Sequence, residues 1–511
     1  MPDDQQDVIA FLKNPSSYGG GVARVEVIET HVSLVFIAGD RAYKLKRAVK
    51  YPYLDFSTAE RRKLACEAEL ALNRRTAPAI YREVRGVFRT ADHLSFSPSG
   101  PPVDWVVVMQ RFDQALLFEA LAKSGGLTPQ LMDELADHIA AFHTAAEQRF
   151  DHGGGTEMGE IAEIQHRCLV AERQAGFALE EVDALLEKWR ERLAAFAAVL
   201  DGRRSAGKVR RCHGDLHLRN ICLFDGKPTL FDCLEFDDAL ASTDVLYDLA
   251  FLLMDLEHRG LANFANRVLN RYLDRSEEDD GLAAMPLFLS LRAGIRAHVT
   301  ASAAQRSGKA ARRAELVGEA HRYLELAHRL LRPEPSRLIA IGGVSGTGKS
   351  TLAAVLAPEL GLRPGARVLR SDVTRKLLLG FAAETRLPAS GYRREVTRRV
   401  YDALRRKATI ALAAGYSAII DAVALVPEER SSFAAVARAA GVPFRGLWLE
   451  APPARMAERI QARRHDASDA SPEVLAEQLH HDPGPLDWVR IDAGGSPADC
   501  LGAARAALAG V

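Results

Sequence analysis

The stretch LIAIGGVSGTGKSTLAAVLAPEL, residues 338–360, decides the fold of the second half of the chain. Its first four residues are apolar and predict a buried strand, and the apolar spacing after Lys349 predicts a helix. Between the two, residues 343–350 fit the pattern G-x-x-x-x-G-K-S/T. The backbone N–H groups of such a loop, placed at the start of a helix, surround phosphate oxygens. The stretch therefore predicts a phosphate-binding loop.

The side chains of this loop extend the prediction to ATP and Mg²⁺. Lys349 has the position of the lysine that reaches the outer phosphates, and Ser350 that of the hydroxyl that ligates the metal. We count Lys349 among the catalytic residues for this reason. The predicted nucleotide-binding residues of the loop are Gly343, Val344, Ser345, Gly346, Thr347, Gly348, Lys349, Ser350 and Thr351.

Two acids follow predicted strands in the same half of the chain. Asp372 ends VLRSD, and Asp421 ends AIID. Ligands of an open parallel sheet bind outside the carboxyl ends of its strands, so both acids are expected near the phosphate loop. Asp421 is predicted as a magnesium ligand. Since helices follow both acids, each could instead be a helix cap.

Arginines on the segment RMAERIQARRHDASDA, residues 455–470, suggest a lid. Arg455, Arg459 and Arg463 share one helical face. Such a face could close over a phosphate during transfer, and Arg459 and Arg463 are predicted nucleotide ligands. The alternative is an ordinary solvated basic face.

The order of the predicted elements divides the chain. Residues 1–332 give a small sheet with one inserted helix, then helices with a few short strands, which is an α+β order. Residues 337–511 alternate strand and helix, which favours an α/β fold with a parallel sheet between helices. Residues 333–336, within a segment containing two prolines, are predicted as the linker between two separately folded domains.

The first half contains HGDLHLRN, residues 213–220, followed by Asp232. This is the H-x-D-x-x-x-x-N spacing of protein-kinase catalytic loops. In such a loop Asp215 accepts the proton of the attacking hydroxyl, and Asn220 and Asp232 hold Mg²⁺ on the ATP phosphates. The segment predicts a second nucleotide site.

HGDLHLRN, LYDLA at 246–250 and the order of elements over residues 20–330 resemble the aminoglycoside phosphotransferase family, which has a protein-kinase-like fold. The resemblance implies a strand lysine on the phosphates that is paired with a helix glutamate. Lys44 and Lys46 lie on one face of the strand, and the family's Y-x-L-K pattern favours Lys46. For the glutamate we prefer Glu67 over Glu69. The glycine-rich loop that this family places between its first two strands is missing, because only Thr30-His31 joins them.

Residues 337–511 resemble the small P-loop kinases of the gluconate kinase, polynucleotide kinase and zeta-toxin group. The matching pieces are GGVSGTGKST, SDVTRK and the arginine-rich stretch after LWLEAP. The resemblance implies phosphoryl transfer from ATP to a hydroxyl. It also implies Asp372 as a catalytic acid or base on the acceptor side and Arg375 as an anion contact. The whole chain resembles a bacterial two-part family that joins an aminoglycoside-phosphotransferase-like domain to an AAA-type kinase domain.

Composition narrows the class of protein. The 511 residues are 48% hydrophobic and 26% charged, and no apolar run is long enough for a membrane span. Lys+Arg and Asp+Glu are both 67, a balance that argues against nucleic acid as the partner. Six scattered cysteines form no C-x-x-C pair, which favours reduced thiols. These features predict a cytoplasmic protein that does not bind membranes.

The leading hypothesis is a bifunctional ATP-dependent kinase of small hydroxyl-bearing molecules, with ATP and Mg²⁺ as cofactors. In a second hypothesis the C-terminal kinase is regulated by an N-terminal domain that binds a ligand without catalysis. In a third, ATP binding switches the interaction with a partner. ATP turnover that depends on a small molecule separates the first two hypotheses from the third.

Overall fold

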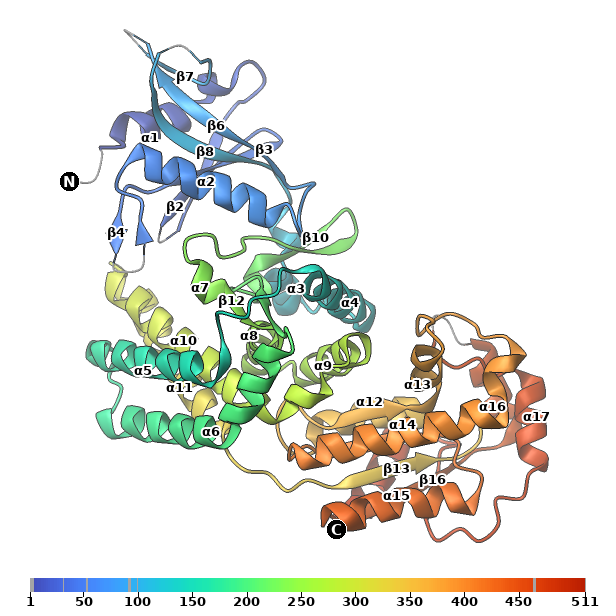
Figure 1. Ribbon diagram of the computed structural model, residues 1–511. Coiled ribbons are helices and arrows are strands. Elements are labelled where there is room, and N and C mark those ends of the chain that lie inside the picture. The colour runs from blue at the N-terminus through green and yellow to red at the C-terminus, as the bar shows by residue number, and fades with distance from the viewer. Residues whose placement is uncertain are drawn as a thin grey trace. The chain divides into compact units, whose positions relative to one another are not determined.

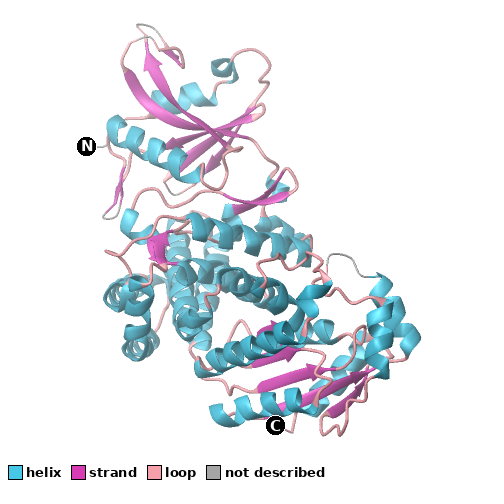
Figure 2. Ribbon diagram, turned by 45° about the vertical axis from the view of Figure 1, so that its right-hand side comes forward, coloured by secondary structure: helices cyan, strands magenta, loops and turns pink. Residues whose placement is uncertain are grey.

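The computed structural model describes residues 4–30, 32–51, 54–90, 93–98, 100–462 and 466–510. Figure 1 labels the elements, and Figure 2 distinguishes strands from helices. Contacts group the chain into two compact units. The first comprises Met1–Gly154 with Asp201–Leu252, and the second comprises Gly155–Leu200 with Leu253–Val511.

The first unit is built on an antiparallel sheet with the strand order β1-β2-β3-β8-β6-β7. Alternate apolar side chains of its strands form a core with the N-terminal helix α1. Helix α2 packs against β8 and β6. The bounds are α1 (Gln6–Lys13), β1 (Val25–Glu29), β2 (Ser33–Ala38), β3 (Arg41–Lys46), α2 (Ala59–Asn73), β6 (Tyr81–Arg89), β7 (Leu94–Ser95) and β8 (Pro102–Gln110).

The rest of this unit consists of helices and short hairpins outside the six-stranded sheet, and most of them follow β8. The catalytic-loop segment lies between β9 and β10, and Asp232 follows β11. The elements are β4 (Lys50–Tyr51), β5 (Leu54–Asp55), η1 (Pro15–Tyr18), η2 (Gln114–Leu116), α3 (Phe118–Ser124), α4 (Pro129–Ala145), β9 (Val209–Arg211), η4 (Leu218–Asn220), β10 (Ile221–Phe224), β11 (Lys227–Leu230), α7 (Asp238–Ala241) and β12 (Ser242–Asp244).

Helices precede the sheet of the second unit along the chain, and three of them also contain residues of the first unit. These three are α5 (Gly154–Ala171), α6 (Leu179–Ser205) and α8 (Val245–His258). The others are η3 (Arg173–Ala175), α9 (Ala262–Ser276), η5 (Asp279–Ala284), α10 (Met285–Arg306) and α11 (Ala310–Leu330). Within the described residues, no helix is both long and apolar enough to cross a bilayer.

The second unit also contains a five-stranded sheet in the order β14-β15-β13-β16-β17, in which every pairing is parallel. The α/β prediction is confirmed. The elements are β13 (Leu338–Gly342), α12 (Lys349–Leu356), η6 (Ala357–Glu359), β14 (Arg367–Arg370), α13 (Ser371–Leu378), η7 (Ala389–Tyr392), α14 (Arg394–Ala413), β15 (Ala418–Asp421), α15 (Pro427–Ala440), β16 (Phe444–Glu450), α16 (Pro453–Ala462), α17 (Pro472–His480), β17 (Val489–Asp492) and α18 (Pro497–Leu508).

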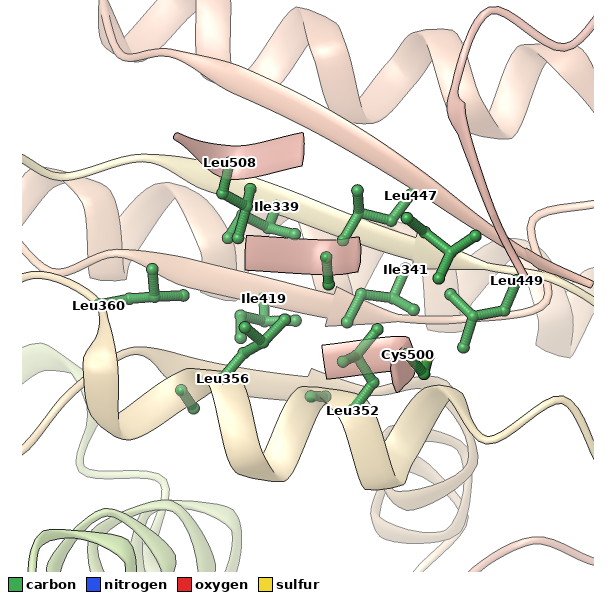
Figure 3. Packing of buried hydrophobic residues seen from close by; sticks show 14 of the residues in the cluster. Ile339, Ile341, Leu352, Leu356, Leu360, Ile419, Leu447, Leu449, Cys500 and Leu508 are labelled. Carbon is green, nitrogen blue, oxygen red and sulfur yellow. The ribbon is translucent and has the colours of Figure 1, made fainter. Parts of the chain in front are cut away.

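The core of this sheet explains why the phosphate loop is held rigidly. All five residues of β13 are buried, as expected for the central strand of a parallel sheet. Ile339 and Ile341 pack against Leu352 and Leu356 of α12 and against residues of α18 (Figure 3). The strand before the loop and the helix after it are therefore fixed in one apolar cluster.

The helices between residues 253 and 331 group with the P-loop sheet. The sequence placed them in a domain of residues 1–332, so contacts and sequence pattern divide the chain differently. Separate folding of residues 1–332 and 337–511 remains a prediction about the isolated parts.

Candidate active sites

The phosphate loop connects β13 to α12 in a conformation that requires glycine. Gly343 has a φ of 130°, and a Cβ there would lie 2.5 Å from the carbonyl oxygen of Leu449. Gly346 has a φ of 86°, and its Cβ would lie 2.6 Å from the carbonyl oxygen of Met456. Larger residues are thus excluded by backbone on the neighbouring strand and helix, which explains the glycine spacing.

Two side chains that follow the glycines make hydrogen bonds within the loop region. The Lys349 ammonium donates to the Val344 carbonyl, 3.1 Å away across the loop. The Ser350 hydroxyl donates to Asp421 Oδ2 at 2.5 Å, at the end of β15. A serine hydroxyl next to a buried carboxylate is a hard-oxygen pair, the donor chemistry that Mg²⁺ prefers. These residues fit the implied metal.

A cavity of about 760 Å³ opens beside this loop. Asp372, in the first turn of α13, lies on its wall together with Arg370 and Asp421. Burial raises the pKa of Asp372, although Arg370 lowers it. Arg370 is also held by Asp466 at 3.0 Å and lies 3.5 Å from Asp421. The two acids predicted from strand ends therefore line one cavity with the phosphate loop, although Asp372 belongs to a helix.

Arg375 also lines the cavity, one helical turn after Asp372. Its guanidinium donates to the Gly391 carbonyl and to Thr397 Oγ1, and its centre lies 5.0 Å from the Tyr392 ring. Arg375 is buried, and its Nε has no hydrogen-bond partner among the described residues. A cation held in this way is suited to an anionic group, the role implied by the resemblance.

The lid arginines differ from one another. Arg459 of α16 donates to the carbonyls of Thr347, at 3.4 Å, and Ala493, at 2.8 Å, so it lies over the loop. Arg455 is exposed and pairs with Glu458. Arg463 lies outside the described residues. Of the two lid arginines that the structure describes, Arg455 and Arg459, only Arg459 lines the cavity.

In the first unit, buried charges connect β3 with α2. Glu69 accepts from Lys44 at 2.8 Å and from Lys46 at 2.5 Å, and none of these three residues is more than 9% exposed. Glu67 points away from this cluster. Its side chain is half exposed and lies 3.7 Å from Lys63. The preference for Glu67 was therefore wrong, because the face of α2 that turns toward β3 carries Glu69.

The two lysines have different further partners. Lys44 binds Asp232 Oδ1 at 2.6 Å, and Lys46 forms an ion pair with Glu235. Burial alone would raise the pKa of Glu69, but the two ammonium groups hold it at about 2. Burial raises the pKa of Glu235 despite its lysine. Sequence reasoning missed Glu235. The pattern that could have indicated it is a second acidic residue three positions after Asp232.

The catalytic loop brings Asp215 and Asn220 together. The Asn220 amide nitrogen donates to both the carbonyl oxygen and Oδ2 of Asp215, each at 2.9 Å. This bond leaves the amide oxygen of Asn220 for a cation. Asp232 has a φ of 62°, a left-handed conformation that is uncommon outside glycine and typical of functional sites. The oxygen donors of Asn220 and Asp232 fit the implied Mg²⁺.

The loop itself is anchored by Asp248 of α8. Its carboxylate accepts the backbone N–H of Gly214 at 2.8 Å and of His213 at 3.2 Å, and it contacts His143 Nε2 at 3.0 Å. The sequence drew attention to this region through LYDLA but assigned Asp248 no role. Asp248 thus connects the catalytic loop to the buried His143 of α4.

The turn between β1 and β2 is short. The backbone N–H and the hydroxyl of Thr30 both donate to the Ser33 carbonyl, and the Ser33 N–H donates to the Thr30 hydroxyl. His31 lies outside the described residues. The first two strands thus meet in a tight hairpin, and no glycine-rich segment connects them.

These two sites define a class of protein: a kinase-like phosphotransferase fold joined to a P-loop kinase fold. The phosphotransferase enzyme family matches residues 54–288, and the AAA domain family matches residues 338–482. The chain is 32% identical over 496 residues to the uncharacterized protein Rv2004c of Mycobacterium tuberculosis, with 94% of each chain covered. The chain belongs to the family of this mycobacterial protein.

Solved structures are similar to portions of the chain. A gluconokinase from Sinorhizobium meliloti 1021 is 22% identical and covers 35% of this chain and 94% of its own, with a TM-score of 0.25. A choline kinase from Cryptosporidium parvum Iowa II is 11% identical and covers 63% of this chain and 95% of its own, with a TM-score of 0.40.

Proposed function

We propose that the chain is a bifunctional ATP-dependent phosphotransferase that acts on hydroxyl groups of small molecules at two separate sites. The observation that carries the proposal is the Ser350–Asp421 pair beside a preformed phosphate loop, facing a cavity that also contains Asp372. The residues that we propose as phosphate ligands, metal ligands and base thus line one cavity. We infer a cytoplasmic location as well.

At the P-loop site, backbone N–H groups and Lys349 hold the ATP phosphates, with Arg459 as a further contact. When bound to Ser350 and Asp421, Mg²⁺ supplies positive charge to the phosphate oxygens. Asp372 accepts the proton of the acceptor hydroxyl, whose oxygen bonds to the γ-phosphorus. The bond from the γ-phosphorus to the bridging oxygen breaks, and ADP leaves. A buried carboxylate with a raised pKa is a stronger base for this step.

At the N-terminal site we assign the phosphate contact to Lys44, because Lys44 touches both Glu69 and Asp232. This assignment replaces the preference for Lys46, which is fully buried between Glu69 and Glu235. Asp215 accepts the acceptor's proton here, while Asn220 and Asp232 are the candidate metal ligands.

A regulatory N-terminal domain is the second candidate, and two observations favour it. Lys44 and Asp232, the two groups that would serve a nucleotide, are paired with each other. The β1–β2 hairpin also lacks the glycine-rich segment that covers ATP phosphates in related folds. In this version the P-loop site performs the chemistry.

Isothermal calorimetry with ATP and Mg²⁺ on the full chain tests the proposal. Two binding events are expected in the wild-type chain, one lost in Lys349→Ala and the other in Asp232→Ala. A single event that Lys349→Ala abolishes supports the regulatory candidate. No binding in the wild-type chain would reject both versions. A screen of metabolites for ADP release then addresses the acceptors.

A further inference from the structure

The outer edge of β14 is covered by helix α9, which lies inside the region matched by the phosphotransferase family. Asn266, Asn270 and Asp274 are spaced by four residues and therefore lie on one face of α9. The amide nitrogens of Asn266 and Asn270 donate to the Ala366 carbonyl at 3.0 and 3.1 Å. Asn270 Oδ1 accepts from Val368 N at 2.7 Å. Side chains of α9 thus bind backbone groups that an edge strand leaves unpaired.

Arg367, the first residue of β14, extends this contact with charge. It is 1% exposed, and its Nε donates to Asp279 Oδ1 at 2.7 Å, while Nη2 donates to Asp274 Oδ1 at 2.6 Å. Nη1 donates to Asn270 Oδ1 at 3.1 Å. Lys407 of α14 lies 3.4 Å from the other oxygen of Asp279. All three nitrogens of the guanidinium are therefore directed at oxygens of α9 and η5.

The strand that this network holds leads directly into the P-loop cavity. β14 ends at Arg370, which is bound to Asp466, and Asp372 follows in the first turn of α13. Only four peptide bonds separate Arg367 from Ser371, so a shift of the strand at Arg367 reaches the cavity wall. Rigid placement of reacting groups supplies much of the catalysis in phosphoryl transfer.

We propose that Arg367 is a positioning residue for the P-loop site, and that Asp274, Asp279 and Asn270 hold it in that role. Through Arg367, a helix of the phosphotransferase-family region fixes the strand that ends at Arg370 and leads into the helix that carries Asp372. Turnover at the P-loop therefore depends on α9 and η5. This inference rests on the proposed role of Asp372 and extends it to residues far away in the sequence.

Hydrogen exchange of the full chain, followed by mass spectrometry, tests the positioning role. In Arg367→Met, exchange in peptides covering residues 368–376 should accelerate about tenfold, while β13 keeps its protection. The matched control is Lys407→Met, which removes a cation from the same Asp279 but takes no hydrogen bond from β14 in the described structure. It should leave residues 368–376 as in the wild-type chain. Unchanged exchange in Arg367→Met would overturn the proposal.

A triple variant separates positioning from stability. Arg367→Met leaves the buried Asp279 and the partly buried Asp274 with weaker partners and destabilises the fold, whereas Arg367→Met/Asp274→Leu/Asp279→Leu replaces the charges by apolar groups. We expect the triple variant to melt near the wild-type temperature and to keep the fast exchange. If it regains the wild-type protection together with the melting temperature, Arg367 only stabilises the fold and the positioning role is wrong.

Kinetics in an Asp215→Asn background give a second readout, with water as the acceptor and ADP release as the signal. Because the phosphate loop is not on β14, the triple variant should lower kcat about tenfold and change the KM for ATP less than twofold. Equal losses in ATP binding would contradict the positioning role. Absence of ATP binding in the wild-type chain would reject the proposed function and leave the exchange result standing.

Discussion

The two candidate sites differ in where their charged groups find partners. In the P-loop site, backbone and side chains surround a cavity of about 760 Å³, and the glycine conformations are set by contacts with β16 and α16. In the first unit, the charged side chains pair with one another; they are Lys44, Lys46, Glu69, Asp232 and Glu235. In one site the glycine positions are fixed by backbone contacts beside an open cavity, whereas in the other the charged groups are paired among themselves. Two sites whose residue types both fit a kinase can therefore differ in whether their charged groups are already paired with one another.

The largest effect is expected where the site is preformed. Lys349→Ala removes the cation beside the outer phosphates and should lower P-loop turnover about 1,000-fold, with little change in stability. Turnover is measured as ADP release with Asp215 replaced by Asn. Lys63→Ala, an exposed lysine of α2, serves as the control and should leave the rate unchanged. Unaltered turnover in Lys349→Ala would show that the loop binds no reacting phosphate.

Asp215→Asn should have the next largest effect and addresses the first unit. The variant keeps a hydrogen-bonding group near Asn220 but loses the proton acceptor, so N-terminal transfer should fall about 100-fold while nucleotide binding persists. Asp232→Ala should lose nucleotide and metal together. Calorimetry and ADP release in the Lys349→Ala background measure both. If Asp215→Asn changes neither quantity, the first unit does not catalyse transfer.

Glu69→Gln probes the self-paired charges through stability. Removal of a carboxylate from between two buried ammonium groups should lower the free energy of unfolding by about 3–5 kcal/mol at pH 7. The pKa of Glu69 is about 2 when folded and about 4.3 when unfolded, so its contribution is complete above about pH 5 and declines as the pH falls toward 2. The gap between variant and wild type in urea titrations should therefore be smaller at pH 3. A gap that widens at pH 3 would contradict this account.

Glu67→Ala should have the smallest effect. Its exposed pair with Lys63 is worth less than about 0.5 kcal/mol, so unfolding and nucleotide binding should both match the wild-type chain. Together with Glu69→Gln, this variant compares the contributions to the free energy of unfolding of a buried and an exposed glutamate on opposite faces of α2. A large loss of stability or of nucleotide binding in Glu67→Ala would mean that α2 does not turn Glu69 toward β3 as described.

The sequence predicted what is local and left open what depends on packing. The phosphate loop was readable because strand, glycines, lysine and helix are contiguous. The same holds for Asp215 and Asn220, which one short loop brings together. Whether Glu67 or Glu69 meets β3 depends on the rotation of α2, which residue types alone do not determine.

Long-range contacts were beyond the sequence for the same reason. Asn266, Asn270 and Asp274 form a polar stripe at helical spacing, which normally indicates a solvated face. Here the stripe binds a strand about a hundred residues away. The grouping of residues 253–331 with the P-loop sheet followed from such contacts and from no local pattern.

The cover that α9 places on β14 also bears on solubility. At the outer side of this strand, the Ala366 carbonyl and the Val368 N–H are taken by asparagine side chains. Without α9, these groups would offer a template to a β-strand of another molecule, and sheets could join edge to edge. A helix that holds a strand in place for chemistry therefore also keeps copies of the protein from aggregating through that strand.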